Sequence, residues 1–187
     1  MLKPVEIVSQ LNRLVFSIDL VGYPSHDANW YRARTHKFYS IILITKGKGE
    51  FIIDGTLHIA EPGKLFVIVP GMETERRNIT DQALEHYIIR FSFVEVFHHE
   101  GEWTYHNQNK ITFPLQGNYS IQNVPPILLL FEQLYHLWKR KGPMIIMRKN
   151  ILFQELWLTI VQDLRAQKSV GNTSTAIDLT VDHMANH

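Results

Sequence analysis

The chain has 187 residues, a formal net charge of +1 and no cysteine. This length suits one substantial domain with a small additional element, and the lack of cysteine excludes disulfides, thiolate zinc sites and a cysteine nucleophile. No basic tract is long enough for non-specific nucleic-acid binding. The longest purely apolar runs have five residues, against about 20 for a membrane-spanning helix. Charged residues interrupt the N-terminal apolar segment, as no secretion signal would allow. We therefore expect a cytoplasmic protein without a membrane partner.

The N-terminal part of the sequence alternates as β-strands do. Residues 1–24 predict one or two strands, because apolar side chains at 14, 16, 18 and 20 alternate with the positions between them. A polar loop over 25–37 leads into the next strand.

Glycines then recur at every eighth residue, and short apolar runs separate them. Strand-sized runs bounded by Gly, Asp-Gly and Pro-Gly predict a meander of antiparallel strands. Strands this short tend to curl into a small barrel or sandwich with one usable cavity. The glycines are Gly47, Gly55, Gly63 and Gly71.

Residues 83–93 predict a further strand with two unlike faces. The side chains at 87, 89, 91 and 93 are aromatic or aliphatic, and we expect them to pack in the core. His86 and Arg90 share the opposite face. A loop or irregular hairpin over 98–109 and a short strand over 110–115 follow.

The C-terminal part has helical periodicity. A first helix is expected over 125–141 and a second over 144–168, joined by a short loop and packed antiparallel. A small-polar linker is predicted over 169–175. The last segment has apolar residues at helical spacing, and we expect it to be the truncated start of a second domain. The expected division is a barrel over 1–120, a helical hairpin over 121–168, the linker, and the segment 176–187.

The order and spacing of several motifs resemble the sensor domain of AraC-type transcription regulators. The resemblance implies a mainly β fold with C-terminal helices, in which a cupin-like antiparallel barrel (a double-stranded β-helix or jelly roll) precedes a helical hairpin. It also implies a small-molecule effector of carbohydrate-like type, a homodimer, and DNA binding only through a helix-turn-helix domain, whose first helix Thr175–His187 resembles. The motifs are Arg34-Thr35-His36, Lys46-Gly47-Lys48-Gly49-Glu50, Asp54-Gly55, Glu61-Pro62-Gly63-Lys64-Leu65 and Val69-Pro70-Gly71.

The sequence departs from the family pattern at two places. Ser40 stands where members often have Glu, and Met72-Glu73-Thr74-Glu75 follows the last Pro-Gly where many carry His. The ligand contacts of other members therefore do not transfer as a set.

The histidines argue against a cupin enzyme. Metal-binding cupins need a converging set of nitrogen and oxygen ligands, beginning with His-x-His. The only close pair here is His98-His99, in a polar loop. We expect no metal, no cofactor and no catalytic residue. A metal-dependent cupin enzyme and a ligand-free dimerisation module remain the alternatives.

Arg90 is the leading candidate for ligand binding. If the aromatic face of its strand packs against the helices, Arg90 points into the barrel, where an unpaired guanidinium costs too much and needs a partner. The competing interpretations are an ion pair, with Glu75 for example, or solvent exposure. Similar expectations, each weighed against a solvated surface or plain core packing, apply to Arg34, His36, Arg76, His86, Tyr39 and Trp30.

The predicted helices carry more apolar positions than one barrel face needs. We expect part of this surface to form an antiparallel seam between two copies of the chain, although core packing is the alternative for the same residues. The candidate seam residues are Leu134, Trp138, Leu152, Leu156 and Ile160.

Overall fold

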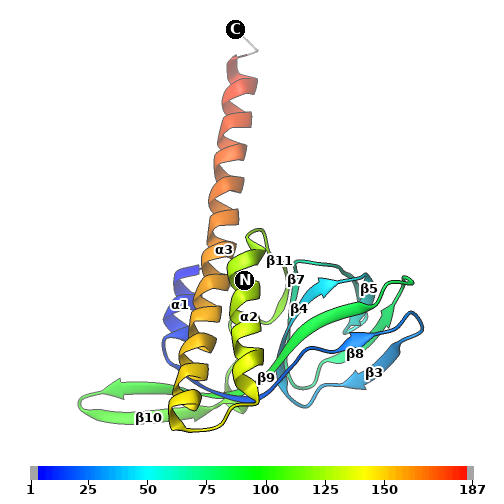
Figure 1. Ribbon diagram of the computed structural model, residues 1–187. Helices are drawn as coiled ribbons and strands as arrows, with labels where there is room; N and C mark the ends of the chain where they lie inside the picture. The colour runs from blue at the N-terminus through cyan, green and yellow to red at the C-terminus, as the bar shows by residue number, and fades with distance from the viewer. Residues whose placement is uncertain (1–3, 185–187) are drawn as a thin grey trace.

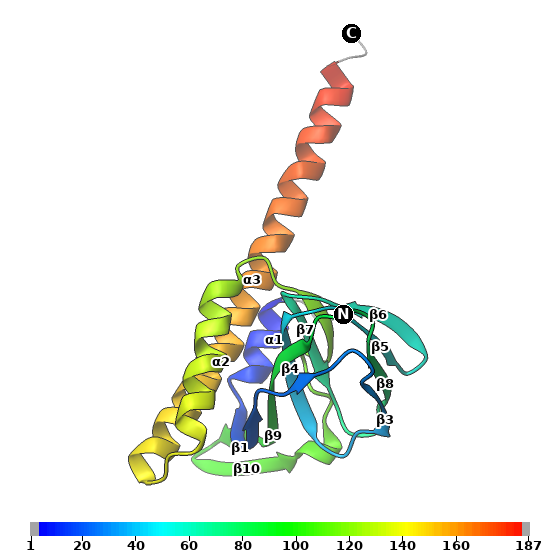
Figure 2. The same ribbon diagram turned by 45° about the vertical axis from the view of Figure 1, so that its right-hand side comes forward.

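Two β-sheets and a pair of long helices form the body of the protein (Figure 1). The computed structural model describes the backbone of residues 4–184 and the side chains of residues 5–169. Figure 2 shows the two sheets facing one another, with the helices on the outer side of the larger sheet. Over the described residues, the sheets remain two separate ladders of seven and four strands. The fold is mainly β and cupin-like, as expected.

The larger sheet packs between the helices and the smaller sheet. Its strands pair in antiparallel fashion, and most strands that lie side by side come from distant parts of the chain. In chain order they are β1 (Leu14–Gly22), β2 (Ser25–His26), β4 (Tyr39–Lys46), β7 (Lys64–Ile68), β9 (Leu84–His99), β10 (Glu102–Asn107) and β11 (Gly117–Ser120).

The smaller sheet closes the other side of the interior. Its strand order is β3-β8-β5-β6, with β3 at Tyr31–Thr35, β5 at Gly49–Ile53, β6 at Thr56–Ala60 and β8 at Glu73–Asn78. The chain therefore passes from the larger sheet to the smaller one and back, and of the four strands of the smaller sheet only β5 and β6 are both consecutive and paired. The predicted simple meander is wrong in this respect, because most of the glycine turns connect the two sheets.

Gly47 shows why glycine is needed at these turns. Its φ is +76° and a Cβ atom there would lie 2.4 Å from the backbone oxygen of Ala83. A side chain would clash with rigid backbone as well as strain the turn. The turn after β4 can therefore lie against the backbone just before Leu84 only because Gly47 has no side chain.

The main apolar core lies between the larger sheet and the helices. Tyr87, Ile89, Phe91 and Phe93 face it, as predicted for that strand. Phe91 contacts the ring of Trp157 at a centroid distance of 5.6 Å. A second apolar cluster, including Ile42, Phe66 and Ile88, fills part of the space between the sheets.

The helices follow the predicted order with shifted ends. Helix α2 spans Val124–Trp138 and helix α3 spans Pro143–Met184. Asp163 on α3 accepts hydrogen bonds from the backbone N–H groups of Gln122 (3.2 Å) and Asn123 (2.8 Å). One carboxylate thereby satisfies two donors at the start of α2 and joins the two helices.

Several local predictions differ from the structure. Residues 4–11, predicted as strand, form helix α1 (Pro4–Leu11). The segment 98–109, expected as a loop or an irregular hairpin, mostly forms the regular hairpin of β9 and β10. The segment 110–115 holds no strand, since the short 3-10 helix η1 (Gln108–Lys110) and a loop lead to β11. The backbone of α3 continues through 169–175, so the predicted linker is helical. The predicted start of a second domain, 176–187, ends in residues 185–187, which lie outside the described residues.

Candidate ligand site: an arginine cluster between the two sheets

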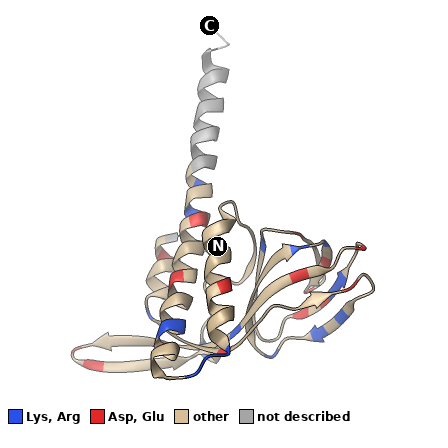
Figure 3. Cartoon of the chain, in the orientation of Figure 1, with Lys and Arg blue, Asp and Glu red and all other residues tan. Residues whose placement is uncertain are grey.

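Strand β8 carries polar side chains on both of its faces. Thr74, Arg76 and Asn78 point between the sheets and are buried, whereas the residues between them point to solvent. Two arginines of the antiparallel neighbour β3 extend this inner face. Arg32 and Arg34 of β3 lie opposite Arg76 and Thr74 respectively, and directly opposed residues share a face with Cβ atoms about 5 Å apart. Figure 3 shows the resulting concentration of basic residues on β3 and β8.

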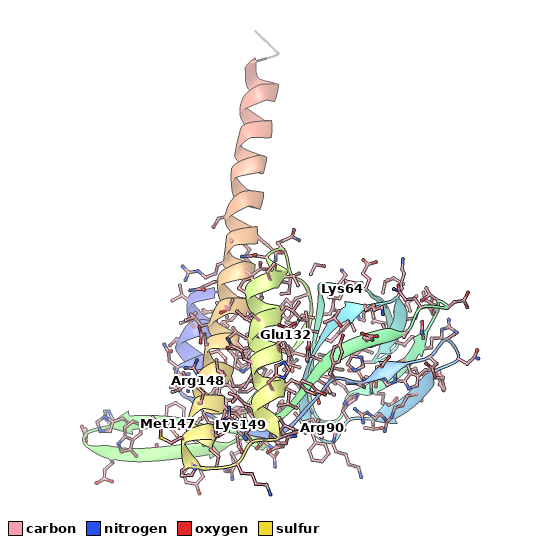
Figure 4. All side chains as sticks on the ribbon, in the orientation of Figure 1. Lys64, Arg90, Glu132, Met147, Arg148 and Lys149 are labelled. Carbon is pink, nitrogen blue, oxygen red and sulfur yellow. The ribbon has the colours of Figure 1, made fainter. Side chains whose placement is uncertain are left out.

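The larger sheet contributes Arg90 from the opposite wall. Because its neighbours Ile89 and Phe91 face the helices, the alternation of the strand turns Arg90 inward, as predicted. Its register partner on β4 is Ser40, and its guanidinium carbon lies 5.4 Å from the ring centroid of Phe38. Figure 4 labels Arg90 near the lower edge of the sheets.

We call Arg32, Arg34, Arg76 and Arg90 the arginine cluster. Its members lie at graded depth: Arg32 is exposed, Arg34 and Arg90 are partly buried, and Arg76 is 3% exposed. Within the part of the chain whose side chains are described, no carboxylate forms an ion pair with any of the four. The Nε atoms of Arg34, Arg76 and Arg90 are buried without a hydrogen-bond partner.

Burial and mutual repulsion both act on this cluster. Burial, followed by the charges of Arg34, Arg32 and Arg90, lowers the pKa of Arg76 to about 9. The Arg76 guanidinium lies over the rings of Phe51 (5.6 Å) and Trp30 (5.9 Å). These aromatic faces attract the cation but do not neutralise its charge.

The ion pair considered for Arg90 does not form. Glu75 lies on the outer face of β8 and accepts a hydrogen bond from the Tyr31 hydroxyl at 3.2 Å. The acid nearest in sequence to Arg76 is therefore turned away from the cluster. This leaves the inner face with positive charge only among the residues just described.

Two histidines border the cluster. His36 Nε2 lies 2.9 Å from Thr74 Oγ1, and burial together with the cluster arginines lowers the pKa of His36 to about 3. His86, on the larger sheet, is also buried, and its Nδ1 has no hydrogen-bond partner. Burial lowers the pKa of His86 to about 3. Both rings are neutral at pH 7.

The two candidate aromatic residues end in different places. Trp30 lies beside Arg76, and the ring of His26 stacks on it at a centroid distance of 3.8 Å. Tyr39 faces the helices instead, within 4.9 Å of the Phe93 ring centroid. Tyr39 is therefore not a ligand contact, because the sheet itself separates it from the cluster.

Sequence reasoning missed some neighbours of the cluster. It did not single out Thr74 or His26, and it gave Arg32 no role beyond a basic strand edge. The signal for Thr74 was weak, because β8 is polar on both faces and shows no apolar alternation. His26 lay in a segment interpreted as loop.

The predicted dimer seam is corrected by the burial of its members. Leu134, Leu152, Leu156 and Ile160 are buried in the core between the helices and the larger sheet. Trp138 packs partly against the same core, and the Lys149 ammonium lies 4.9 Å from its ring centroid. These side chains are occupied within one chain, so any seam must use another face.

Two further observations bear on the class of site. Within the described part of the chain, His, Asp and Glu side chains nowhere gather in a group of three that could hold a metal ion. Among the described helices, none combines the length and apolar character needed to cross a membrane.

Comparison with known proteins places the chain in a family. A comparison with curated proteins finds no match. Among solved structures, the Cnp3 cupin domain of Schizosaccharomyces pombe is 18% identical over 42% of this chain and 64% of that chain, with a TM-score of 0.36. A predicted oxalate decarboxylase from Thermotoga maritima is 15% identical over 48% of this chain and 74% of that chain, with a TM-score of 0.37. The sequence also matches the family profile of AraC-like ligand binding domains over residues 17–156, well over half of its length. The chain therefore belongs to the family of AraC-like ligand binding domains.

Proposed function

We propose that this protein is the effector-binding and dimerisation part of an AraC-like transcription regulator, and that its effector is a small polar metabolite of sugar or sugar-acid type. The observation that carries the proposal is the arginine cluster. The chain belongs to a ligand-binding family. It holds unpaired, partly buried polar groups on the facing walls of its two sheets. Buried polar groups without partners are rare in structural cores and common where a ligand supplies the partner.

The effector site and the long helix are linked through the larger sheet. Arg90 belongs to β9, and its neighbour Phe91 packs against Phe153 (5.3 Å) and Trp157 on α3. An effector that binds one arrangement of β9 and α3 more tightly than another would shift the population toward it. In a longer regulator this shift would reposition a DNA-binding domain attached beyond α3.

The outer face of α3 supports dimerisation. Met144, Met147, Ile151 and Leu158 are exposed and recur at helical spacing on one side of the helix. Met147, labelled in Figure 4, is 64% exposed. Exposed apolar side chains that recur on one side of a helix, as in this stripe, are typical of an interface between protein surfaces. We propose that two copies pair through it.

Thermal unfolding in the presence of small metabolites tests the sensor function. A ligand that binds only the folded chain raises its melting temperature. We expect a sugar, a sugar acid or a related metabolite to do so, and Arg90→Ala to abolish the response. If no metabolite of any charge shifts the melting temperature, the proposed function is wrong.

A further inference from the structure

We infer that the effector is a small anion with at least two negative charges, carried by carboxylate or phosphate groups, which bridges arginines from the two facing sheets. This inference rests on the proposed function and names the class of ligand for the same site. It excludes neutral sugars as the main ligands.

The first step is that buried charges elsewhere in this chain have partners. The buried Glu95 carboxylate pairs with Arg13 at 2.9 Å. The buried carboxylate of Asp163 accepts two backbone N–H groups. Arg77, the exposed neighbour of Arg76, pairs with Glu50 on the outer face. The chain therefore follows the general rule that buried charge is compensated.

The arginine cluster is the exception to this rule. Arg76 is almost fully buried, and its Nε has no partner. The other three arginines are close enough to depress its pKa, so repulsion adds to the cost of burial. A fold tolerates such a cost where a ligand removes it.

The second step concerns the charge of that ligand. A neutral polyol would offer hydroxyl oxygens to the guanidinium groups but would leave their charges uncompensated in a partly dry site. Carboxylate and phosphate oxygens instead form short, charge-assisted and often bidentate hydrogen bonds with arginine. Arg34 and Arg76 stand on the smaller sheet and Arg90 on the larger one, so a ligand that satisfies both walls needs at least two negative charges, on two carboxylates or on one phosphate.

The third step concerns the aromatic residues. Sugar-binding sites commonly present an open aromatic face to the ring. Here His26 covers one face of Trp30, with the ring planes 10° apart, and Tyr39 lies behind the sheet. Of the two aromatic candidates for ligand binding, Trp30 therefore has one face occupied and Tyr39 is turned away from the site.

A matched series of six-carbon polyols separates charge from shape. D-glucitol, D-gluconate and D-glucarate differ mainly in having zero, one or two carboxylates, and D-glucose 6-phosphate tests phosphate against carboxylate. Each is added to the purified chain at 10 mM with sodium chloride adjusted to equal ionic strength, and the melting temperature is measured. We expect the largest rise with one of the two dianions and none with glucitol.

Two substitutions on one strand provide the control. Arg76→Met should weaken binding of the active dianion by about tenfold or more, the loss expected for a charge-assisted contact. Arg77→Met, on the outer face of the same strand, should leave the affinity unchanged. Arg34→Gln offers a milder second variant should Arg76→Met fail to fold.

The outcomes distinguish this inference from the proposed function. If glucitol or another neutral metabolite raises the melting temperature as much as either dianion does, the chain is still a sensor and only the anion inference fails. If glucarate and glucose 6-phosphate both leave the melting temperature unchanged, the inference is also overturned, because four uncompensated arginines should hold such dianions at millimolar concentration. Equal weakening by Arg76→Met and Arg77→Met would likewise contradict it.

Discussion

His36 Nε2 lies 2.9 Å from Thr74 Oγ1, so a buried imidazole is tied to the strand that carries Arg76. The same imidazole is surrounded by the arginine cluster, whose charges oppose its protonation. Burial, followed by the charges of these arginines, keeps His36 neutral in the folded protein. This arrangement has a measurable effect on stability.

Acid should destabilise the protein through its buried histidines. The folded-state pKa of His36 and of His86 is about 3, against about 6.5 in the unfolded chain. The unfolded state therefore binds more protons between these values, and the free energy of unfolding should fall as the pH drops from 6.5 towards 3. The expected loss is at most about 1.4 kcal/mol per pH unit for each histidine.

Denaturant unfolding at pH 7, 5.5 and 4.5 checks this prediction. His36→Gln should make the pH dependence of the free energy of unfolding shallower. A wild-type stability that stays constant over this range would show that His36 and His86 are not held neutral by the fold.

The unpaired charge of Arg76 should cost the ligand-free chain stability. Arg76→Met keeps most of the side-chain volume and removes a buried, uncompensated cation. We expect the free energy of unfolding to rise by about 1 kcal/mol or more, as when buried ionic groups are replaced by apolar ones. Calorimetry without ligand measures this. Arg77→Met, which breaks only the surface pair with Glu50, should cost about 0 to 1 kcal/mol. A destabilised Arg76→Met would mean that its contacts with Trp30 and Phe51 outweigh its charge.

The joint between the helices depends on Asp163. Asp163→Ala leaves the N–H groups of Gln122 and Asn123 without their acceptor, and we expect it to cost about 2 kcal/mol. Gln162→Ala, exposed on the same turn, should change the stability by less than about 0.5 kcal/mol. Urea unfolding of the two variants makes the comparison, and equal effects would show that the hydrogen bonds accepted by Asp163 contribute nothing to stability.

The exposed stripe of α3 should determine the oligomeric state. Ile151→Glu places a charge in the middle of the stripe, and we expect it to convert a dimer into a monomer without lowering the melting temperature of the monomer. Light scattering after gel filtration measures the mass. Asn150→Glu, which lies off the stripe, is the control and should remain dimeric. A wild-type chain that is monomeric at all concentrations would refute pairing through this stripe.

The sequence predicted the wall that carries Arg90 because that wall obeys a simple alternation. Tyr87, Ile89 and Phe91 repeat with period two, and this alone turns Arg90 inward once the helices cover the aromatic face. The helical hairpin was predictable for a related reason, since its apolar period is 3.6 and Pro and Gly mark its ends. These parts of the fold are encoded locally.

The rest depends on contacts between distant segments. Strand β4 has an unbroken apolar run over 41–44 and no clear alternation, so nothing local shows that Tyr39 pairs with Phe91 and shares its outward face. Strand β8 is polar on both sides, and only its pairing with β3 reveals that Arg76 meets Arg32. The buried hairpin leucines looked like interface residues because the sequence does not show which helix face the sheet covers.

The central claim is that the arginine cluster holds the effector between the sheets. A crystal structure of the chain grown with whichever dianion raises the melting temperature tests it most directly. Our account predicts anion density within hydrogen-bond distance of Arg76 and of Arg34 or Arg90. Density for that ligand at another place, with the guanidinium groups of the cluster still unpaired, would contradict the account.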